Sequence, residues 1–402
     1  MASAVSFFPV EETTKLAALI GLETEIQTLL DEQNYDSVYA KFAKGSGSLL
    51  EAVGPKDLEK VYNLLIAIVS QAKQDDLPDL VPAIVNPIVE SGSENAVQKL
   101  KVLSNLYNSL ESTSHIRYSV FFAIVQLSAQ AGELDAVVPV LGQLESFFVA
   151  WDVDLDEKRR LILLLADVLG EQVEFQNLSY EYLIQYLKTY PKSTGSYPQQ
   201  VQETAVKTVK EALRLNFVTN FSDLSSLGPV QALKSSHPDL LSLVSVFLGG
   251  DVKAYHQFVK KHPGFISKSE LDESSLERKI RLLTLSTLAC GYVDVDVGDL
   301  PFNIVASALD IEDTDVEEWV VTGIRSGLID GRIDQVKKVV CVSRATHRRF
   351  TDKQWDLLSD RLAGWGNNLK DILVVLQNAK AVAAAAQQQQ LQLQQQQQQQ
   401  QQ

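Results

Sequence analysis

Residues 314–342 read TDVEEWVVTGIRSGLIDGRIDQVKKVVCV, and this stretch decides the fold of the chain's C-terminal third. Its first half predicts a helix, because apolar residues recur at helical spacing at Val316, Trp319, Val320, Ile324 and Leu328. Thr314 and Glu317 have the spacing of a capping box, which predicts that the helix starts there. The second half holds two runs, 328–334 and 336–342, whose β-branched residues predict a β-hairpin.

The residues upstream complete a small domain. Residues 292–297 (YVDVDV) alternate strictly between apolar and acidic side chains, which predicts a short strand. A short helix is expected at about 300–310. A strand, two helices and a hairpin follow one another in the order of a winged helix-turn-helix, so we predict a winged helix over 291–350.

The residues downstream predict one long helix. Thr351-Asp352-Lys353-Gln354 has the form of a second capping box. The apolar residues that follow form a heptad seam, with spacings of three and four, at Trp355, Leu358, Leu362, Trp365, Leu369, Ile372 and Leu376. Gly364 and Gly366 each cost a helix about 1 kcal/mol relative to alanine. We therefore predict a C-terminal association helix over 351–380 that packs against a partner helix, followed by an Ala/Gln-rich disordered tail over 381–402.

The first 290 residues have helical periodicity almost throughout. Leu100, Leu103, Tyr107 and Leu110 form one apolar stripe, and Gly132, Gly170, Pro191 and Gly291 follow other stripes as helix stops. Helices that each expose an apolar face cover one another by stacking. The predicted fold class is mainly α: a right-handed helical-repeat (solenoid) arm, then the winged-helix module and the C-terminal association helix. We divide the arm into 1–95, an N-terminal helical region, and 96–290, the repeats; the alternative is a compact, irregular helical domain.

Composition excludes several classes of protein. The 402 residues carry a formal charge of −15, which excludes a chain that coats nucleic acid along its whole length. Cys290 and Cys341 have no metal or redox spacing and suit a reducing compartment. The N-terminal residues lack the pattern of a signal peptide, and no apolar run approaches the ~18 residues that span a bilayer. We expect a cytoplasmic protein with no membrane contact.

No constellation of residues points to an enzyme. The sequence contains no H-E-x-x-H, G-x-x-x-x-G-K-[ST] or G-x-S-x-G motif, and Gly45-Ser46-Gly47 does not fit a dinucleotide fingerprint. The five histidines are scattered, as surface or capping residues would be. Cys341 lies near His347, but we interpret it as a buried apolar thiol rather than as a nucleophile. We expect no catalytic, cofactor-binding or metal residues, and no cofactor.

The hairpin and its exit carry a cluster of cations. The second helix of the winged helix is acidic, which opposes binding in a DNA groove. The hairpin is basic at Arg332, Lys337, Lys338, Arg344, Arg348 and Arg349. This patch is a candidate contact for ribosomal RNA or an acidic partner, and the alternative is a solvated wing with no ligand.

Four segments carry a resemblance to a known family: KLKVLSNLYNSL (99–110), SHIRYSVFFAIVQLSAQAG (114–132), LIDGRIDQVKKVVCVSRATHRRF (328–350) and WDLLSDRLAGWGNNL (355–369). They resemble the PCI-domain family, and within it the subunit M family of eukaryotic translation initiation factor three, over about 95–180 and 276–376.

The resemblance implies a non-catalytic scaffold subunit of that factor. Its partners would be other initiation factor three subunits, of PCI and MPN type, and its C-terminal helix would join a shared bundle. Through the complex it would reach the small ribosomal subunit and support the initiation of protein synthesis. The alternatives are a PCI scaffold subunit of the signalosome or the proteasome lid, or a winged-helix module that binds nucleic acid.

Overall fold

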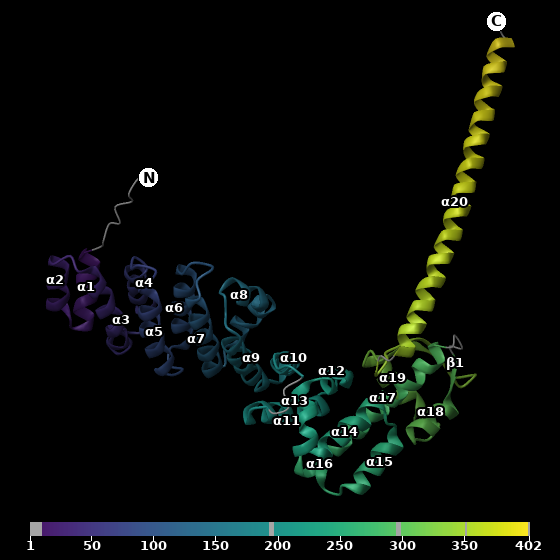
Figure 1. The fold of residues 1–402 in the computed structure, drawn as a ribbon, viewed down its shortest axis with the longest axis horizontal. Helices are drawn as coiled ribbons and strands as arrows, with labels where there is room; N and C mark the ends of the chain where they lie inside the picture. Colours follow the sequence, from purple (N-terminus) through teal and green to yellow (C-terminus); the bar gives the residue numbers. More distant parts are fainter. Residues whose placement is uncertain (1–9, 193–196, 295–298, 350–351, 401–402) are drawn as a thin grey trace. The chain divides into compact units, whose positions relative to one another are not determined.

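A computed structural model describes residues 10–192, 197–294, 299–349 and 352–400 of the chain (Figure 1). The chain divides into two compact units, 1–194 and 195–402. The mainly helical class predicted from the sequence is confirmed, with a small antiparallel sheet confined to unit two among the described residues. The five segment boundaries proposed from the sequence stay predictions.

Unit one is a run of short helices joined by tight turns. Its elements are α1 (Val10–Ile20), α2 (Glu23–Asp31), α3 (Tyr35–Ala52), α4 (Leu58–Val69), α5 (Leu77–Glu90), α6 (Ala96–Ser109), α7 (Ile116–Ala131), η1 (Leu134–Ala136), η2 (Val138–Gln143), α8 (Leu144–Ala150), α9 (Leu155–Gly170), η3 (Val173–Phe175) and α10 (Gln176–Lys188). Gly132 takes a left-handed conformation (φ +73°) that ends α7, as expected from its position.

The helices of unit one pack on their second neighbours along the chain. α3 packs on α5, α5 on α7 and α7 on α9, while α4 packs on α6. One continuous apolar core runs from Leu16 in α1 to Leu127 in α7. Several helices therefore cover the apolar face of the helix two places before them, and the adjacent pairs α6–α7 and α9–α10 also pack, which is the arrangement of a helical repeat.

The Gly45-Ser46-Gly47 sequence is explained by close packing inside α3. A Cβ at Gly45 would lie 2.6 Å from Ile20 Cγ2, and one at Gly47 would lie 3.4 Å from Pro87. Pro87 has no N–H for the carbonyl of Ala83, one turn earlier in α5. The buried Ser46 hydroxyl donates to that carbonyl instead, at 3.0 Å. The two glycines and the serine thus let α3 lie against α1 and against a proline-containing helix.

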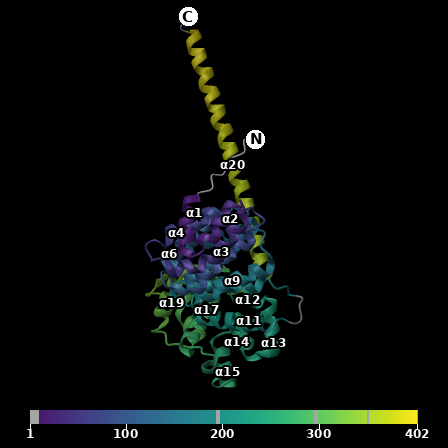
Figure 2. The same ribbon diagram turned by 90° about the vertical axis from the view of Figure 1, so that its left-hand side faces the viewer.

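Unit two opens with a second set of helices and ends with the winged helix. Its elements are α11 (Gln199–Arg214), α12 (Phe221–Ser225), α13 (Gly228–Ser236), α14 (Pro238–Gly249), α15 (Val252–Lys261), α16 (Phe265–Lys268), α17 (Glu273–Asp294), β1 (Asp299–Pro301), α18 (Phe302–Leu309), α19 (Val316–Arg325), β2 (Ile329–Asp334), β3 (Val339–Ala345) and α20 (Asp352–Gln400). Figure 2 shows α11, α13 and α14 side by side, and these helices pack on one another.

A buried lysine joins α11 to α17. The ammonium of Lys279 in α17 donates to the carbonyls of Ala212 (2.5 Å) and Leu215 (2.7 Å), with Leu213 at 3.5 Å. The last carbonyls of a helix have no partner within the helix. Lys279 therefore caps the C-terminus of α11 from a helix more than 60 residues away in sequence.

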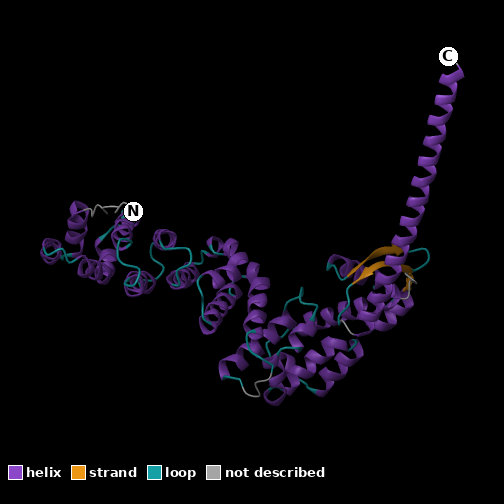
Figure 3. Ribbon diagram, turned by 45° about the horizontal axis from the view of Figure 1, so that its top comes forward, coloured by secondary structure: helices purple, strands orange, loops and turns teal. Residues whose placement is uncertain are grey.

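The winged helix is confirmed, with its sheet in the order β1-β3-β2 and both pairs antiparallel (strands orange in Figure 3). Its core combines α17, α18, α19 and the inner faces of β2 and β3. A bulge between Asp330 and Gly331 shifts the register of the hairpin. A Cβ at Gly331 would lie 2.5 Å from the carbonyl oxygen of Cys341, so the close approach of the two strands requires glycine there.

The strand predicted at 292–297 is wrong where it can be compared. α17 continues past Gly291 to Asp294, and 295–298 lie outside the described residues. The first strand is β1, at Asp299–Pro301. Tyr292 and Val293 pack against the winged-helix core as the last turn of α17. That packing outweighs the strand propensity of an alternating sequence.

The capping box predicted for α19 is also wrong. α19 begins at Val316, so Asp315 is its N-cap and makes no side-chain capping bond. The Glu317 carboxylate instead accepts a hydrogen bond from Gln335 in the hairpin turn, at 2.9 Å. Thr314 contacts the Asp315 carboxylate at 3.4 Å. The Glu317 side chain, which the local pattern assigned to the cap, therefore makes a tertiary contact instead. The second predicted capping box starts at Thr351, which lies outside the described residues.

The C-terminal helix is longer than its heptad seam. α20 runs from Asp352 to Gln400, through the Ala/Gln segment that the sequence predicts to be disordered. Alanine and glutamine have high helix propensity, and 381–400 contain neither proline nor glycine. The backbone can therefore continue as a helix although the segment has no apolar face to bury.

Candidate interaction surfaces

The seam of α20 is exposed along its whole length. The seven predicted residues are between 40% and 64% exposed, with Trp365 the most and Leu358 the least. Their spacing places them on one side of the helix, as expected. Two tryptophans and five aliphatic residues in one exposed row form a surface that another helix can cover.

The seam widens at 372–376 into a surface that is apolar all round. Leu373, Val374 and Val375 lie outside the heptad positions and are more than half exposed, as are Ile372 and Leu376. A helix that is apolar on every side is normally buried among several others. This part of α20 therefore fits the middle of a helical bundle better than a two-stranded contact.

The first turns of α20 contact the rest of unit two. The guanidinium of Arg361 donates to the carbonyl oxygen of Val293 at the end of α17, at 3.2 Å. Leu357, which is not a seam residue, is half-buried. The side of the helix that contacts unit two therefore borders the seam, because Arg361 lies three residues from Leu358 and four from Trp365.

Five of the six predicted cations of the basic patch lie on the wing surface. Arg332, Lys337, Lys338, Arg344 and Arg349 are exposed. Acidic residues offset part of this charge, because Asp334 lies 4.0 Å from Lys337 Nζ and Asp330 is the register partner of Arg344 in the hairpin. A modest positive patch remains on β2, β3 and their turn.

The sixth cation, Arg348, does not belong to that surface. Its side chain is only 6% exposed and donates through Nη1 to the carbonyl of Gly250, at 2.5 Å. The segment after β3 turns inward against α14 and α15, which takes Arg348 into the interior while Arg349 stays outside. Both residues carry the same charge, so the sequence did not show that Arg348 is buried and Arg349 exposed.

The exposed side of α19 is acidic. Asp313, Asp315 and Glu318 are exposed, and the pair Arg281–Trp319 occupies the side that faces α17, with the guanidinium 5.4 Å from the ring centre. Carboxylates at the start of the helix would be repelled by phosphates on either side of a groove. The structure therefore places acidic residues on the exposed side of α19, as the sequence predicts. A helix that reads DNA would need cations at those positions.

Cys341 has the environment of an unreactive thiol. It lies half-exposed on the sheet, opposite Asp299 of β1 and Arg332 of β2. A hydrogen bond to the Asp299 carboxylate raises the pKa of the Cys341 thiol, so the thiolate that a nucleophile needs is disfavoured. Within the described residues no group of three metal-ligating side chains comes together, and no helix is long and apolar enough to cross a membrane.

The structure adds residues that the sequence did not single out. Leu373, Val374 and Val375 were visible as an apolar run but do not fit a single heptad stripe. Lys279 and the burial of Arg348 gave no signal, because each depends on contacts with residues far away in the chain.

Comparisons with known proteins identify two matching families. The PCI domain matches residues 259–344, and the C-terminal helix of eIF3 subunit M matches residues 348–376. Three similar proteins are each named eukaryotic translation initiation factor 3 subunit M. The protein of Phaeosphaeria nodorum is 33% identical over 90% of this chain and 82% of its own length. That of Dictyostelium discoideum is 30% identical over 81% and 80%, and that of Chaetomium globosum is 31% identical over 92% and 87%.

Proposed function

Since the chain belongs to the subunit M family of eukaryotic translation initiation factor 3, we propose that it works in translation initiation as a non-catalytic scaffold subunit of that factor. In this role it supports assembly on the small ribosomal subunit through protein contacts. Its direct partners are other subunits of the factor, of PCI and MPN type. It acts in the cytoplasm, where initiation takes place.

The exposed seam of α20 carries the proposal. Leaving a row of tryptophan, leucine and isoleucine side chains in water is unfavourable, because each fully buried apolar side chain contributes about 1.5–3 kcal/mol. Burial in a bundle with sister helices removes that cost. A scaffold subunit needs such a surface, whereas an enzyme does not.

We expect Trp355→Ala combined with Leu362→Ala to release the chain from the complex. Both side chains lie on the seam and are more than half exposed, so the fold itself loses little. The readout is a native pull-down of the full-length variant, with mass spectrometry of the subunits recovered. Association should fall by tenfold or more, since ~1.4 kcal/mol of lost contact already corresponds to tenfold.

The matched control is Asp360→Ala combined with Asn367→Ala, on the opposite side of the same helix. It should leave the recovered subunits unchanged. Circular dichroism of both doubles should match that of the unaltered protein. Intact assembly in the seam double would exclude the bundle role, and recovery of signalosome or proteasome-lid subunits would replace translation with one of those assemblies.

The basic wing is proposed as a contact with ribosomal RNA. Arg332 and Lys337 are exposed on the hairpin of unit two. We expect Arg332→Gln with Lys337→Gln to weaken binding of the full chain to labelled small-subunit ribosomal RNA. The slope of log affinity against log salt should become shallower by about 2, one for each lost phosphate contact.

The matched control replaces Lys60 and Lys101 with glutamine; both are exposed lysines of unit one. Fluorescence anisotropy at several salt concentrations measures both doubles. Equal losses in the two doubles would mean non-specific attraction, and no loss in either would leave the wing as a solvated surface.

A further inference from the structure

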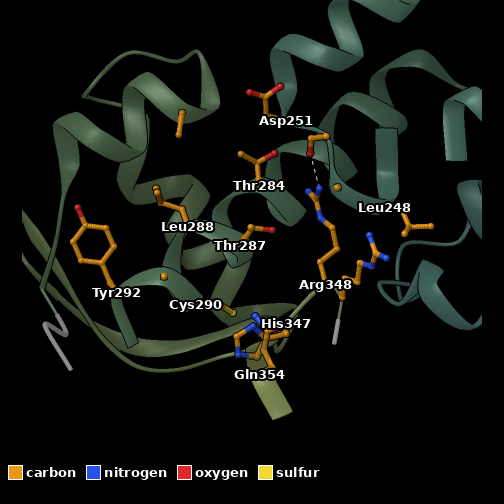
Figure 4. A pocket seen from close by; sticks show the side chains of 15 residues that line it. Leu248, Asp251, Thr284, Thr287, Leu288, Cys290, Tyr292, His347, Arg348 and Gln354 are labelled. Carbon is orange, nitrogen blue, oxygen red and sulfur yellow. Dashed lines mark hydrogen bonds between the residues drawn. The ribbon is translucent and has the colours of Figure 1, made fainter. Parts of the chain in front are cut away.

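A cavity of about 1010 Å³ lies between the helices of unit two and the segment that leaves the winged helix (Figure 4). Its walls come from the α14–α15 turn, from α17 and from residues 347–349. Much of the lining is apolar, including Leu248, Leu288 and Ala308. The volume is at the upper end of the range of small-ligand pockets.

Arg348 lies in this cavity with two of its donors unused. Nη1 donates to Gly250, but neither Nε nor Nη2 has an acceptor among the described residues, and neither is exposed to solvent. Figure 4 shows the guanidinium amid Thr284, Asp251 and the Gly250 carbonyl. Thr284 donates its own hydroxyl to Ile280, and the Asp251 carboxylate accepts from the amide of Ala254.

An unpaired buried guanidinium is unfavourable. Burial lowers the pKa of Arg348 to about 10, and the nearby Asp251 opposes that shift, so the group is still charged at neutral pH. Buried donors normally find acceptors, and buried charges are normally paired. Nε and Nη2 together form the edge of arginine that holds a carboxylate with two parallel hydrogen bonds.

We propose that this cavity binds the carboxylate of an acidic side chain presented by a partner protein, held by the Nε–Nη2 edge of Arg348. The apolar walls fit the methylenes of a glutamate and the apolar residues beside it. Because neither nitrogen reaches solvent, the acceptor must enter the cavity with a small shift of its wall. A slender side chain can do this, whereas the hydrated backbone of RNA would stay at the surface. The inference goes beyond the proposed function, since it concerns unit two alone and holds in any assembly.

The test uses the full chain and two tripeptides as probes, acetyl-Leu-Glu-Leu-amide and its Gln counterpart. They differ only in the charge of the central side chain. Ligand-observed NMR should give an affinity for the Glu peptide about tenfold higher than for the Gln peptide, the ratio expected when a charge-assisted bond replaces a neutral one.

Three variants separate the site from the surface. Arg348→Met should abolish the preference for the Glu peptide, and Arg344→Met, at an exposed cation of β3 that does not line the cavity, should keep it. Gly291→Phe offers a second route if Arg348→Met fails to fold. Gly291 lines the cavity, and a Cβ there meets nothing within 4 Å, so a side chain has room to start at this position and the ring is meant to occupy the cavity. It should also abolish binding.

Equal affinities for the two peptides would overturn the proposal, and so would a preference for the Glu peptide that survives either Arg348→Met or Gly291→Phe. So would displacement of the Glu peptide by an eight-residue oligouridylate, because the site would then take RNA. The seam double on α20 leaves the cavity intact and should bind the Glu peptide normally, so failure here and failure of the scaffold role can be told apart.

Discussion

Lys279→Met is expected to lower the free energy of unfolding by about 1–3 kcal/mol at pH 7, because the buried carbonyl of Ala212 loses the donor that Lys279 supplies, and an unsatisfied carbonyl costs about 1–3 kcal/mol. The Leu215 carbonyl still accepts from the amide of Val218, at 3.3 Å. The methionine side chain is unbranched and only one atom shorter than that of lysine, so little space is emptied. The loss is confined to the bonds with Ala212 and Leu215 and is partly offset because a buried charge is removed. Urea unfolding of the full chain gives the difference, and hydrogen exchange should show lost protection at the end of α11.

The cost should also depend on pH. Burial lowers the pKa of Lys279 to about 7, against about 10.4 in the unfolded chain. Between these values the unfolded state binds more protons, so stability rises with pH from 7 towards 10 and is lost as pH falls through that window. Methionine does not titrate. The difference between the two proteins should therefore grow by about 1–2 kcal/mol from pH 7 to pH 9, at up to 1.36 kcal/mol per pH unit.

Arg278→Met, at the exposed neighbour on α17, is the control and should change stability by less than about 0.5 kcal/mol at either pH. If Lys279→Met behaved like Arg278→Met, the buried cap would contribute nothing. If Lys279→Met lowered the stability by the same amount at both pH values, the hydrogen bonds would be supported but the lowered pKa of Lys279 would be excluded.

Ser46→Ala is expected to cost about 1–2 kcal/mol, because the carbonyl of Ala83 then has no donor in a buried contact between α3 and α5. Alanine is the better helix former, so the intrinsic preference of α3 acts in the opposite direction. The buried hydroxyl of Tyr62 donates to the Ser46 carbonyl at 2.7 Å, and that bond uses the backbone and should survive. Thermal unfolding with hydrogen exchange across α5 measures the effect.

Pro87→Ala supplies the control, because an amide at position 87 can donate to the Ala83 carbonyl itself. In that background Ser46→Ala should cost little or nothing. The coupling between the two changes should be about 1–2 kcal/mol, within the range found for residues that share a partner. Strictly additive changes would show that Ser46 does not replace the missing amide.

The features that could be predicted from the sequence are those set by local periodicity. The heptad spacing of Trp355 and its successors, and the β-branched runs around Gly331, placed the long helix and the hairpin. The alternating pattern at 292–297 led to a wrong strand prediction. A pattern of period two does not show that Tyr292 and Val293 pack on the winged-helix core as part of a helix. The capping-box prediction was wrong for a similar reason, because Glu317 accepts a hydrogen bond from the hairpin turn instead of capping α19.

The unpredictable features are those made by contacts between distant segments. Lys279 and Arg348 read as ordinary surface cations until the structure brings each to a helix end more than 60 residues away in sequence. Nothing in the local sequence distinguishes Arg348 from Arg349. The candidate cavity therefore comes from the structure alone, whereas the seam was available from the sequence.

The belt of aliphatic side chains at 372–376 affects the steady-state amount of this protein in a cell. A copy made in excess of its partners carries that belt into water, where chaperones and proteases recognise such segments. Its repulsive charge of −15 slows self-association but does not hide the belt. We expect the steady-state amount of the chain to follow the supply of its partners, so that its lifetime, and not only its synthesis, sets the stoichiometry.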